Sequence, residues 1–210
     1  RETIARVAAG AIAIKILGML GISVMAYTKS IGEVEIDMNN FDEAEILNNM
    51  LYMPDRIAAE KASELVDAKR AECDSVGGVV ECVVKGLMPG VGETVFNKLD
   101  ASLAKAIMSI GAVKAFEIGD GVSVAKALGS DNNDSFMINE AGKVCKETNH
   151  AGGILGGMSD GDDVILRAYF KPTPSIFKPI DFPGFVRGLV ADCFMIERAV
   201  CNFSSTFSSG

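Results

Sequence analysis

The sequence contains a single histidine, His150, among its 210 residues. It also lacks any Cys-x-x-Cys pair or Cys/His cluster, so no zinc site is predicted. An odd number of widely spaced cysteines does not form the disulfide framework of a small secreted domain, and a reducing cytoplasm fits this usage better. The five cysteines are Cys73, Cys82, Cys145, Cys193 and Cys201.

Basic residues are too few for a nucleic-acid partner. The net charge is −8, and no basic stripe is present to neutralise phosphates. A membrane span is not predicted either, because the apolar residues 7–27 include three glycines and Lys15, and a lysine at mid-membrane costs about 2.5–3.5 kcal/mol. We interpret this stretch as a buried helix that feeds a strand. The hydrophobic content of 49% therefore points to subunit interfaces.

The sequence also lacks the usual nucleotide-binding motifs. No G-x-x-x-x-G-K-[S/T] segment occurs. Gly119-Asp120-Gly121 resembles the start of a dinucleotide-binding turn, but Val124 stands where that fingerprint needs glycine or alanine. We therefore predict neither a P-loop nor a Rossmann fold.

Residues 148–176 organise the chain. The glycine loop (residues 148–157) has four glycines within six positions, which allows left-handed turns or close backbone approach. Residues 164–170 alternate as a half-buried strand does. The proline segment (residues 171–175) follows, in which Pro172 and Pro174 stiffen the backbone around Thr173. With Lys171 and two hydroxyls, this segment is a candidate grip for phosphate or a flavin edge; an ordinary loop is the alternative.

The remaining pattern predicts one α+β domain over residues 1–210. We expect helices over residues 3–19, 55–70 and 97–108, the second capped by Asp55 and the third with Leu99, Leu103, Ala106 and Ile107 inward. Strands are expected over residues 22–28, 79–85 and 112–118. The polar residues 130–146 are expected at the surface, a further helix from Phe185, and a mobile Ser-rich tail over residues 202–210.

The order helix, glycine, strand occurs twice, around Gly21 and around Gly111. Met19-Leu20-Gly21-Ile22 and Ser109-Ile110-Gly111-Ala112 occupy equivalent places. Two copies of such a unit predict a pseudo-twofold core and not a solenoid.

Six ordered motifs resemble the chorismate synthase family and cover residues 1 to about 176. Residues 1–13 resemble its ARET helix, and residues 73–81 its DS-x-GG segment. Residues 92–101 resemble G-E-x-x-F-x-KLDA, and residues 108–121 the SI-x-AVKG-x-EIG run. Residues 148–161 resemble TN-x-AGG-I-x-GG-I-S-x-G, and residues 171–176 resemble KP-T-x-S-I. The sequence is identified as a member of this family.

The resemblance implies a β-α-β sandwich fold with an internal duplication. It implies anti-1,4-elimination of phosphate from 5-enolpyruvylshikimate 3-phosphate, which gives chorismate in the last common step of the shikimate pathway. Reduced FMN is the expected cofactor, although no net redox change occurs. Some members reduce their flavin with NADPH and others use an outside source. A cytoplasmic homotetramer is the expected assembly.

The resemblance also assigns residues to the site. FMN contacts fall on Gly111, Ala112, Gly156, Lys171, Pro172, Thr173, Pro174 and Ser175, and a contact to the substrate phosphate falls on Arg1. The chain departs from the family at Ala115, where glycine is usual, at Pro174, where Ser or another residue occurs, and at Gly111, which offers only backbone.

The acid–base residues of the family have no counterpart here. The family uses two histidines and the Asp of a GRHDP motif, whereas His150 stands at the variable position of TN-x-AGG and is interpreted as structural. No catalytic residue is therefore predicted in this sequence, and we expect it to hold part of such an enzyme, with family segments missing at Gly184–Phe185 and near Gly188. The alternative is an inactive flavin- or nucleotide-binding homologue that acts in assembly.

Overall fold

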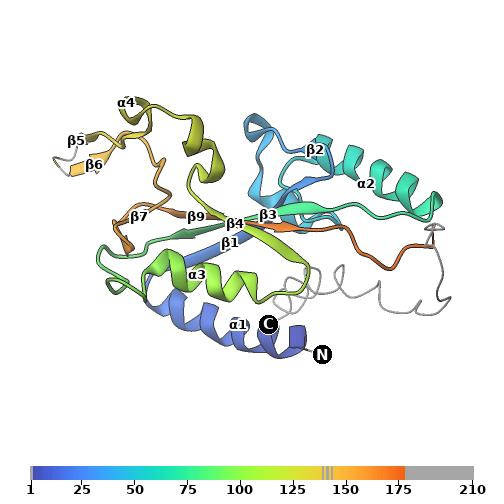
Figure 1. The fold of residues 1–210 in the computed structure, drawn as a ribbon, viewed down its shortest axis with the longest axis horizontal. Helices are drawn as coiled ribbons and strands as arrows, with labels where there is room; N and C mark the ends of the chain where they lie inside the picture. The colour runs from blue at the N-terminus through green and yellow to red at the C-terminus, as the bar shows by residue number, and fades with distance from the viewer. Residues whose placement is uncertain (1, 139, 141, 143, 178–210) are drawn as a thin grey trace. The chain divides into compact units, whose positions relative to one another are not determined.

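The computed structural model describes residues 2–138, 140, 142 and 144–177 (Figure 1). Five predictions lie outside the described residues: the Arg1 phosphate contact, the helix from Phe185, the Ser-rich tail, and the junctions at Gly184–Phe185 and Gly188. The chain divides into two compact units. Among the described residues, unit 1 comprises residues 2–13, 27–80 and 170–177, and unit 2 comprises the described residues of 14–26 and 81–169. The single domain stays a prediction.

A five-stranded sheet has the strand order β2-β1-β3-β9-β4. β1 and β2 form an antiparallel hairpin in which Ser30 faces Glu35. The strands predicted over residues 22–28, 79–85, 112–118 and 164–170 are all confirmed, with small shifts at the ends. The five strands are β1 (Ser23–Ile31), β2 (Val34–Glu35), β3 (Gly78–Lys85), β4 (Val113–Ile118) and β9 (Val164–Phe170).

Unit 1 builds its core around helix α2 (Arg56–Ala71). The predicted cap is confirmed, because the Asp55 carboxylate accepts the backbone N–H groups of Ile57 at 2.9 Å and Ala58 at 3.2 Å. Burial alone would raise the pKa of Asp55, but the N–H groups of Asp37, Ala58 and Ile57 outweigh it and lower that pKa. Two short 3-10 helices, η1 (Met38–Asn40) and η2 (Glu43–Leu47), connect β2 to this cap.

Unit 2 packs helix α3 (Leu99–Met108) against β4 and against the small hairpin of β7 (Ile154–Leu155) and β8 (Met158–Ser159). A second hairpin joins β5 (Phe136–Ile138) to β6 (Val144–Lys146), after the short helices η3 (Gly121–Lys126) and α4 (Gly129–Asn132). Along β9, Val164, Leu166 and Ala168 are buried, as the alternation predicts. Contrary to prediction, Ala106 of α3 is exposed.

Helix α1 (Glu2–Met19) forms as predicted but is not buried. Ile4 and Ile12 are 74% and 64% exposed, because within the described part of the chain little packs on this apolar face. The helix ends in a Schellman turn, in which Ile22 N–H bonds to Leu17 O at 3.0 Å and Gly21 takes φ +76°. None of the described helices combines the length and apolar character needed to cross a bilayer.

The predicted repeat of helix and strand occurs as α1–β1 and α3–β4. The two connections differ in detail. Gly21 is left-handed in the first, whereas Ala112, with φ +68°, is left-handed in the second, and Gly111 is not. An added turn after α3, closed by Val113 N–H to Ile110 O at 3.3 Å, shifts the left-handed position away from the glycine.

Candidate ligand-binding site

A cavity of about 500 Å³ lies in unit 1. Its wall is formed by the end of β1, residues 50–52, the C-terminal part of α2, residues 73–80 and part of residues 170–177. Much of the wall is apolar, including Ile31, Val66 and Phe170. The volume falls in the range of about 300–1,000 Å³ that is typical of small-molecule sites.

The proline segment forms one side of this cavity. Lys171, Thr173 and Ser175 line it, whereas Pro172 and Pro174 are exposed and do not. Proline has no N–H and fixes φ, so the two prolines hold the three polar residues on a stiff, extended backbone. A flexible cation and two hydroxyls therefore face an apolar space, an arrangement that suits a ligand with both an anionic and an apolar part.

Residues 73–80, which carry the DS-x-GG motif, form the part of the wall next to the proline segment. The Ser75 hydroxyl donates a hydrogen bond of 2.7 Å to the carbonyl oxygen of Thr173. The motif carries part of the family resemblance, but its spacing alone assigns no role to Ser75. A serine followed by two glycines just before a strand was the available signal, since glycine often marks close approach of two backbones.

Gly111, Ala112 and Gly156, the other predicted FMN contacts, belong to unit 2 and do not line the described cavity. Gly156 lies at the turn between β7 and β8, whereas Gly111 follows the C-terminus of α3. The Leu99 N–H at the other end of α3 bonds to Gly157 O at 2.8 Å, so this ten-residue helix, about 15 Å long, separates the two glycines. A Cβ built at Gly111 or Gly156 would meet no atom within 4 Å, so both present open backbone.

The glycine loop takes the left-handed turns that the sequence predicts. Gly152, Gly153, Gly156 and Gly157 all have positive φ, between +61° and +88°. A Cβ at Gly152 would collide with the backbone nitrogen of Gly119, which confirms the expected close approach. The Asn149 side chain closes the turn from inside, since it accepts Gly153 N–H and donates to Asp163 O, each at 2.8 Å.

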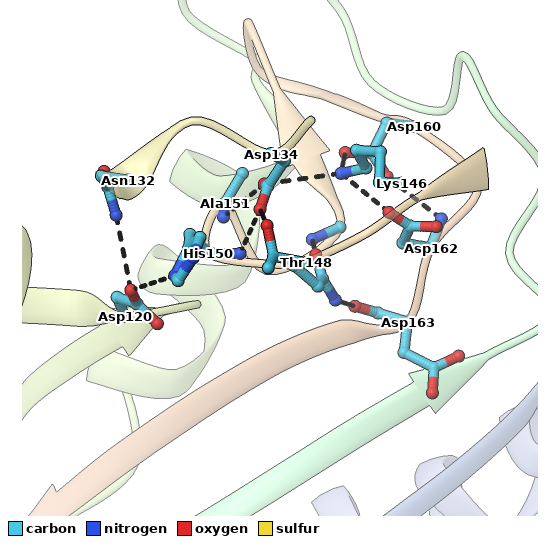
Figure 2. A network of polar contacts seen from close by, with 12 residues as sticks. Asp120, Asn132, Asp134, Lys146, Thr148, His150, Ala151, Asp160, Asp162 and Asp163 are labelled. Atoms are coloured by element: carbon cyan, nitrogen blue, oxygen red, sulfur yellow. Dashed lines mark hydrogen bonds and ion pairs between the residues drawn. The ribbon is translucent and has the colours of Figure 1, made fainter. Parts of the chain in front are cut away.

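Asp134 fixes the start of the glycine loop (Figure 2). Its carboxylate accepts the N–H groups of His150 at 2.7 Å and Ala151 at 3.0 Å and the Thr148 hydroxyl at 2.7 Å. Burial alone would raise the pKa of Asp134. These three hydrogen bonds and the charge of Lys146 outweigh burial and lower the pKa to about 2.

Lys146 joins this carboxylate to two others. Its Nζ lies 2.8 Å from both Asp160 and Asp162 and 3.7 Å from Asp134 (Figure 2). The lysine side chain is only 4% exposed, whereas most of the described residues between 130 and 146 are exposed, as their polarity predicts. Burial would lower the pKa of Lys146, but Asp160 and Asp162 raise it. Spacing could not reveal this cluster, because its members converge from two hairpins.

His150 pairs with Asp120, with 2.6 Å between Nδ1 and Oδ2. Asn132 donates to the same carboxylate oxygen at 3.4 Å, and Asp120 N–H donates to His150 O at 2.9 Å. This contact fixes the imidazole on the turn after β4 (Figure 2). The interpretation of His150 as a structural residue stays a prediction.

A second charged group crosses the sheet on the face opposite Val164 and Leu166. Arg167 Nε lies 2.5 Å from Glu81, and its Nη1 donates to Gly119 O at 2.5 Å. Tyr169 donates its hydroxyl to Glu117 at 2.7 Å. Glu81 and Glu117 are 5% and 9% exposed, so two nearly buried carboxylates gather around one guanidinium. Alternation along β3 placed Glu81 and Cys82 on different faces of the strand. It could not show that the face of Glu81 is the buried one.

The three described cysteines are free. Burial, with a contribution from the Glu81 charge, raises the pKa of Cys82 to about 11, which keeps this thiol protonated. Cys73 is exposed and lines the cavity. Among the described residues, no group of three or more His, Cys, Asp or Glu is placed to hold a metal ion.

The mixed sheet and the cavity beside the proline segment define an α+β protein with a cavity of the size that small-molecule sites have. The family model described as chorismate synthase matches residues 1–182. The chain belongs to the chorismate synthase family, which confirms the identification made from its motifs.

The relatives and a solved structure agree with this assignment. The chain is 62% identical to a chorismate synthase of Agathobacter rectalis and 59% identical to one of Lachnospira eligens, in each case over 84% of this chain and 48% of the relative. A crystal structure of chorismate synthase matches with a TM-score of 0.72 and 32% identity, over 82% of this chain and 56% of that one. The predicted fold is thereby confirmed, and the chain spans about half the length of the curated relatives it matches.

Proposed function

We propose that this chain contributes to a chorismate synthase, a lyase that eliminates phosphate from 5-enolpyruvylshikimate 3-phosphate to give chorismate with the help of reduced FMN. The observation that carries the proposal is the cavity in which Lys171, Thr173 and Ser175 face an apolar wall, at the motif where family members contact FMN. Family membership over residues 1–182 supports the reaction class.

The residues present fit FMN. A cavity of about 500 Å³ combines three basic side chains (Lys69, Arg70 and Lys171) and several hydroxyls with aliphatic and aromatic side chains, including Val76, Phe170 and Ile176. The polar residues suit a phosphate or the oxygen and nitrogen edge of the ring system, and the apolar wall suits the ring faces. When bound, reduced FMN supplies electron density that helps the substrate phosphate to leave.

The residues of this chain bind and orient the ligand in this proposal. Lys171 places a positive charge where an anion forms or is held. The positive charge stabilises the anion more strongly in a water-poor site than in bulk water. The hydroxyls of Thr173 and Ser175 orient polar ligand atoms, and the apolar wall limits water. Gly111 and Gly156, in unit 2, remain predicted flavin contacts, and an added Cβ at either would meet open space. We assign no proton transfer to His150, because it stands at the variable position of the TN-x-AGG motif.

Lys171→Ala in the full-length protein tests the proposal. We expect FMN binding, measured by flavin fluorescence, to weaken by roughly 1–3 kcal/mol, the range for loss of a charged hydrogen bond. The thermal midpoint should barely move, because Lys171 is exposed. Lys61→Ala is the matched control, since Lys61 is also exposed in unit 1 but does not line the cavity.

Two further measurements complete the test. FMN should protect Cys73 from alkylation by N-ethylmaleimide, because this thiol lines the same cavity. Release of phosphate from the substrate, assayed without oxygen, separates an active enzyme from an inactive assembly homologue. Unchanged FMN affinity in Lys171→Ala together with unprotected Cys73 would refute this site, and absence of phosphate release would favour the inactive homologue.

The whole protein is proposed to form a homotetramer. Several large apolar side chains of α1 are exposed in this chain, among them Ile4, Ile12 and Met19 at 74%, 64% and 86%. Apolar surface of this kind is typical of interfaces. Sedimentation of the full-length protein at micromolar concentration should give a tetramer, and a stable monomer would contradict the proposal.

The cellular setting and the reductant are also proposals. Free thiols at Cys73, Cys82 and Cys145 are consistent with a reducing cytoplasm, and the net charge of −8 speaks against a nucleic-acid partner. NADPH as a reductant of the flavin is tested by following its absorbance with FMN and the purified protein. No oxidation would indicate an outside source of reduced flavin.

A further inference from the structure

The wall of the cavity and the proline segment are joined across 98 positions of sequence. Ser75 Oγ donates a 2.7 Å hydrogen bond to Thr173 O, and both residues are half-buried. Thr173 stands between two prolines, which have no N–H to donate to a neighbouring strand. Its carbonyl is therefore a natural point at which a side chain can anchor the segment.

A close backbone contact lies two residues further along. A Cβ built at Gly77 would be 2.6 Å from Phe170 O and 3.1 Å from Pro172 Cδ. Gly77 has no positive φ, so this position needs glycine for space and not for conformation. The backbone at Gly77 thus sits against the point where β9 ends and the proline segment begins.

The neighbouring strand holds this wall from the other side. Gly32 N–H bonds to Gly77 O at 2.8 Å, and a Cβ at Gly78 would be 2.8 Å from Ser30 O. Gly77 and Gly78 therefore fit between the end of β1 and the end of β9, in agreement with the strand order β1-β3-β9. Backbone packing therefore fixes the residues of the cavity wall that contact the proline segment.

We propose that Ser75 and Gly77 are positioning residues, which hold the proline segment so that Lys171, Thr173 and Ser175 face the cavity. This inference rests on the proposed function, since it takes FMN as the ligand of that segment. Ser75 acts on the ligand through the Thr173 carbonyl, and Gly77 acts through the space it leaves for Phe170 and Pro172. Sites that lack such support lose precision before they lose fold.

Ser75→Ala and Ser75→Thr in the full-length protein test the hydrogen bond. FMN dissociation constants should rise about five- to tenfold in Ser75→Ala, the effect of losing one hydrogen bond. Ser75→Thr keeps the hydroxyl and should restore affinity to within about twofold. Ser123→Ala is the matched control, because the Ser123 hydroxyl also donates to a backbone carbonyl, that of Asp120, at 2.6 Å in unit 2.

Gly77→Ala tests the space, and its added methyl group should raise the FMN dissociation constant more than Ser75→Ala does. If Gly77→Ala fails to fold, the serine pair alone decides. Loss of thermal stability in Ser75→Ala with unchanged FMN affinity would overturn the inference. Lys171→Ala, measured alongside, separates failure of the positioning role from failure of the flavin site. If Lys171→Ala weakens FMN binding and Ser75→Ala does not, only the positioning role fails. If neither weakens FMN, the flavin site itself is wrong.

Discussion

The glycine loop and the proline segment hold their backbones by different means. Asp134 and Lys146, both buried and charged, fix the glycine loop, and the carboxylate binds two backbone N–H groups directly. The proline segment is anchored by a neutral hydroxyl at Ser75, by the closeness of Gly77 and by its own two prolines. The charged side chains that fix the glycine loop thus differ in kind from the neutral groups that hold the predicted flavin contacts of the proline segment.

We draw a general expectation from this contrast. Changes in the network around the glycine loop should lower the free energy of unfolding, whereas changes in the proline segment should alter ligand affinity with little effect on stability. Ligand-contacting segments belong to the less stable part of a fold, because they must admit and release what they bind. Substitutions at Lys146, Gly152 and Asp134 test the stable side of the comparison, in order of decreasing effect, and Gly156→Ala is compared with Gly152→Ala.

Lys146→Met should have the largest effect. It removes a buried cation and leaves the Asp134 and Asp160 carboxylates close together without a counter-charge. Breaking a buried charge pair in this way typically costs about 3–5 kcal/mol. Urea unfolding of the full-length protein measures the loss. Arg56→Met is the control: its ion pair with Glu60 is 77% and 67% exposed, so the change should cost under about 1 kcal/mol.

Gly152→Ala should cost about 3 kcal/mol, and Gly156→Ala about 1–2 kcal/mol. The two glycines have nearly the same φ, +65° and +61°, so alanine pays the same left-handed penalty at both. At Gly152 the new Cβ also collides with Gly119, whereas at Gly156 it meets no atom within 4 Å. Thermal unfolding of the two variants gives the difference. Equal losses would show that the backbone at Gly119 moves freely.

Asp134→Asn should lower stability at neutral pH by about 2 kcal/mol. The folded-state pKa of Asp134, about 2, is below the ordinary value of 3.8, so its contribution is present above about pH 4 and is lost as the pH falls toward 2. The variant should therefore lose less stability than the parent protein over that range. Asp131→Asn is the control, because Asp131 is exposed. Parallel acid profiles for parent and Asp134→Asn would contradict the prediction.

The regular elements were predictable because short-range patterns determine them. Alternation located β9, and an aspartate after a proline located the cap of α2 at Asp55. Helix α1 was placed correctly, but its burial was not, since a helical apolar stripe does not say what covers it. Exposure of Ala106 in α3 has the same origin: periodicity gives a face, and only packing decides how far that face is covered.

The polar networks were not predictable, because they join residues from separate elements. Lys146 meets Asp160 from another hairpin, and Arg167 meets Glu81 from another strand. In the proposed site, motif resemblance placed Lys171, Thr173 and Ser175, which the structure brings to one cavity. It could not point to Ser75, whose contact with Thr173 depends on β3 and β9 being neighbours.

The place of β9 in the sheet has a consequence during synthesis. β9 lies between β3 and β4 but is made last of the three, so both earlier strands present an unpaired edge until residues near 170 have left the ribosome. Unpaired strand edges invite pairing with other chains. A chain that stops before β9 therefore exposes the unpaired edges of β3 and β4. Completion of β9 pairs both edges and protects the nascent protein from aggregation.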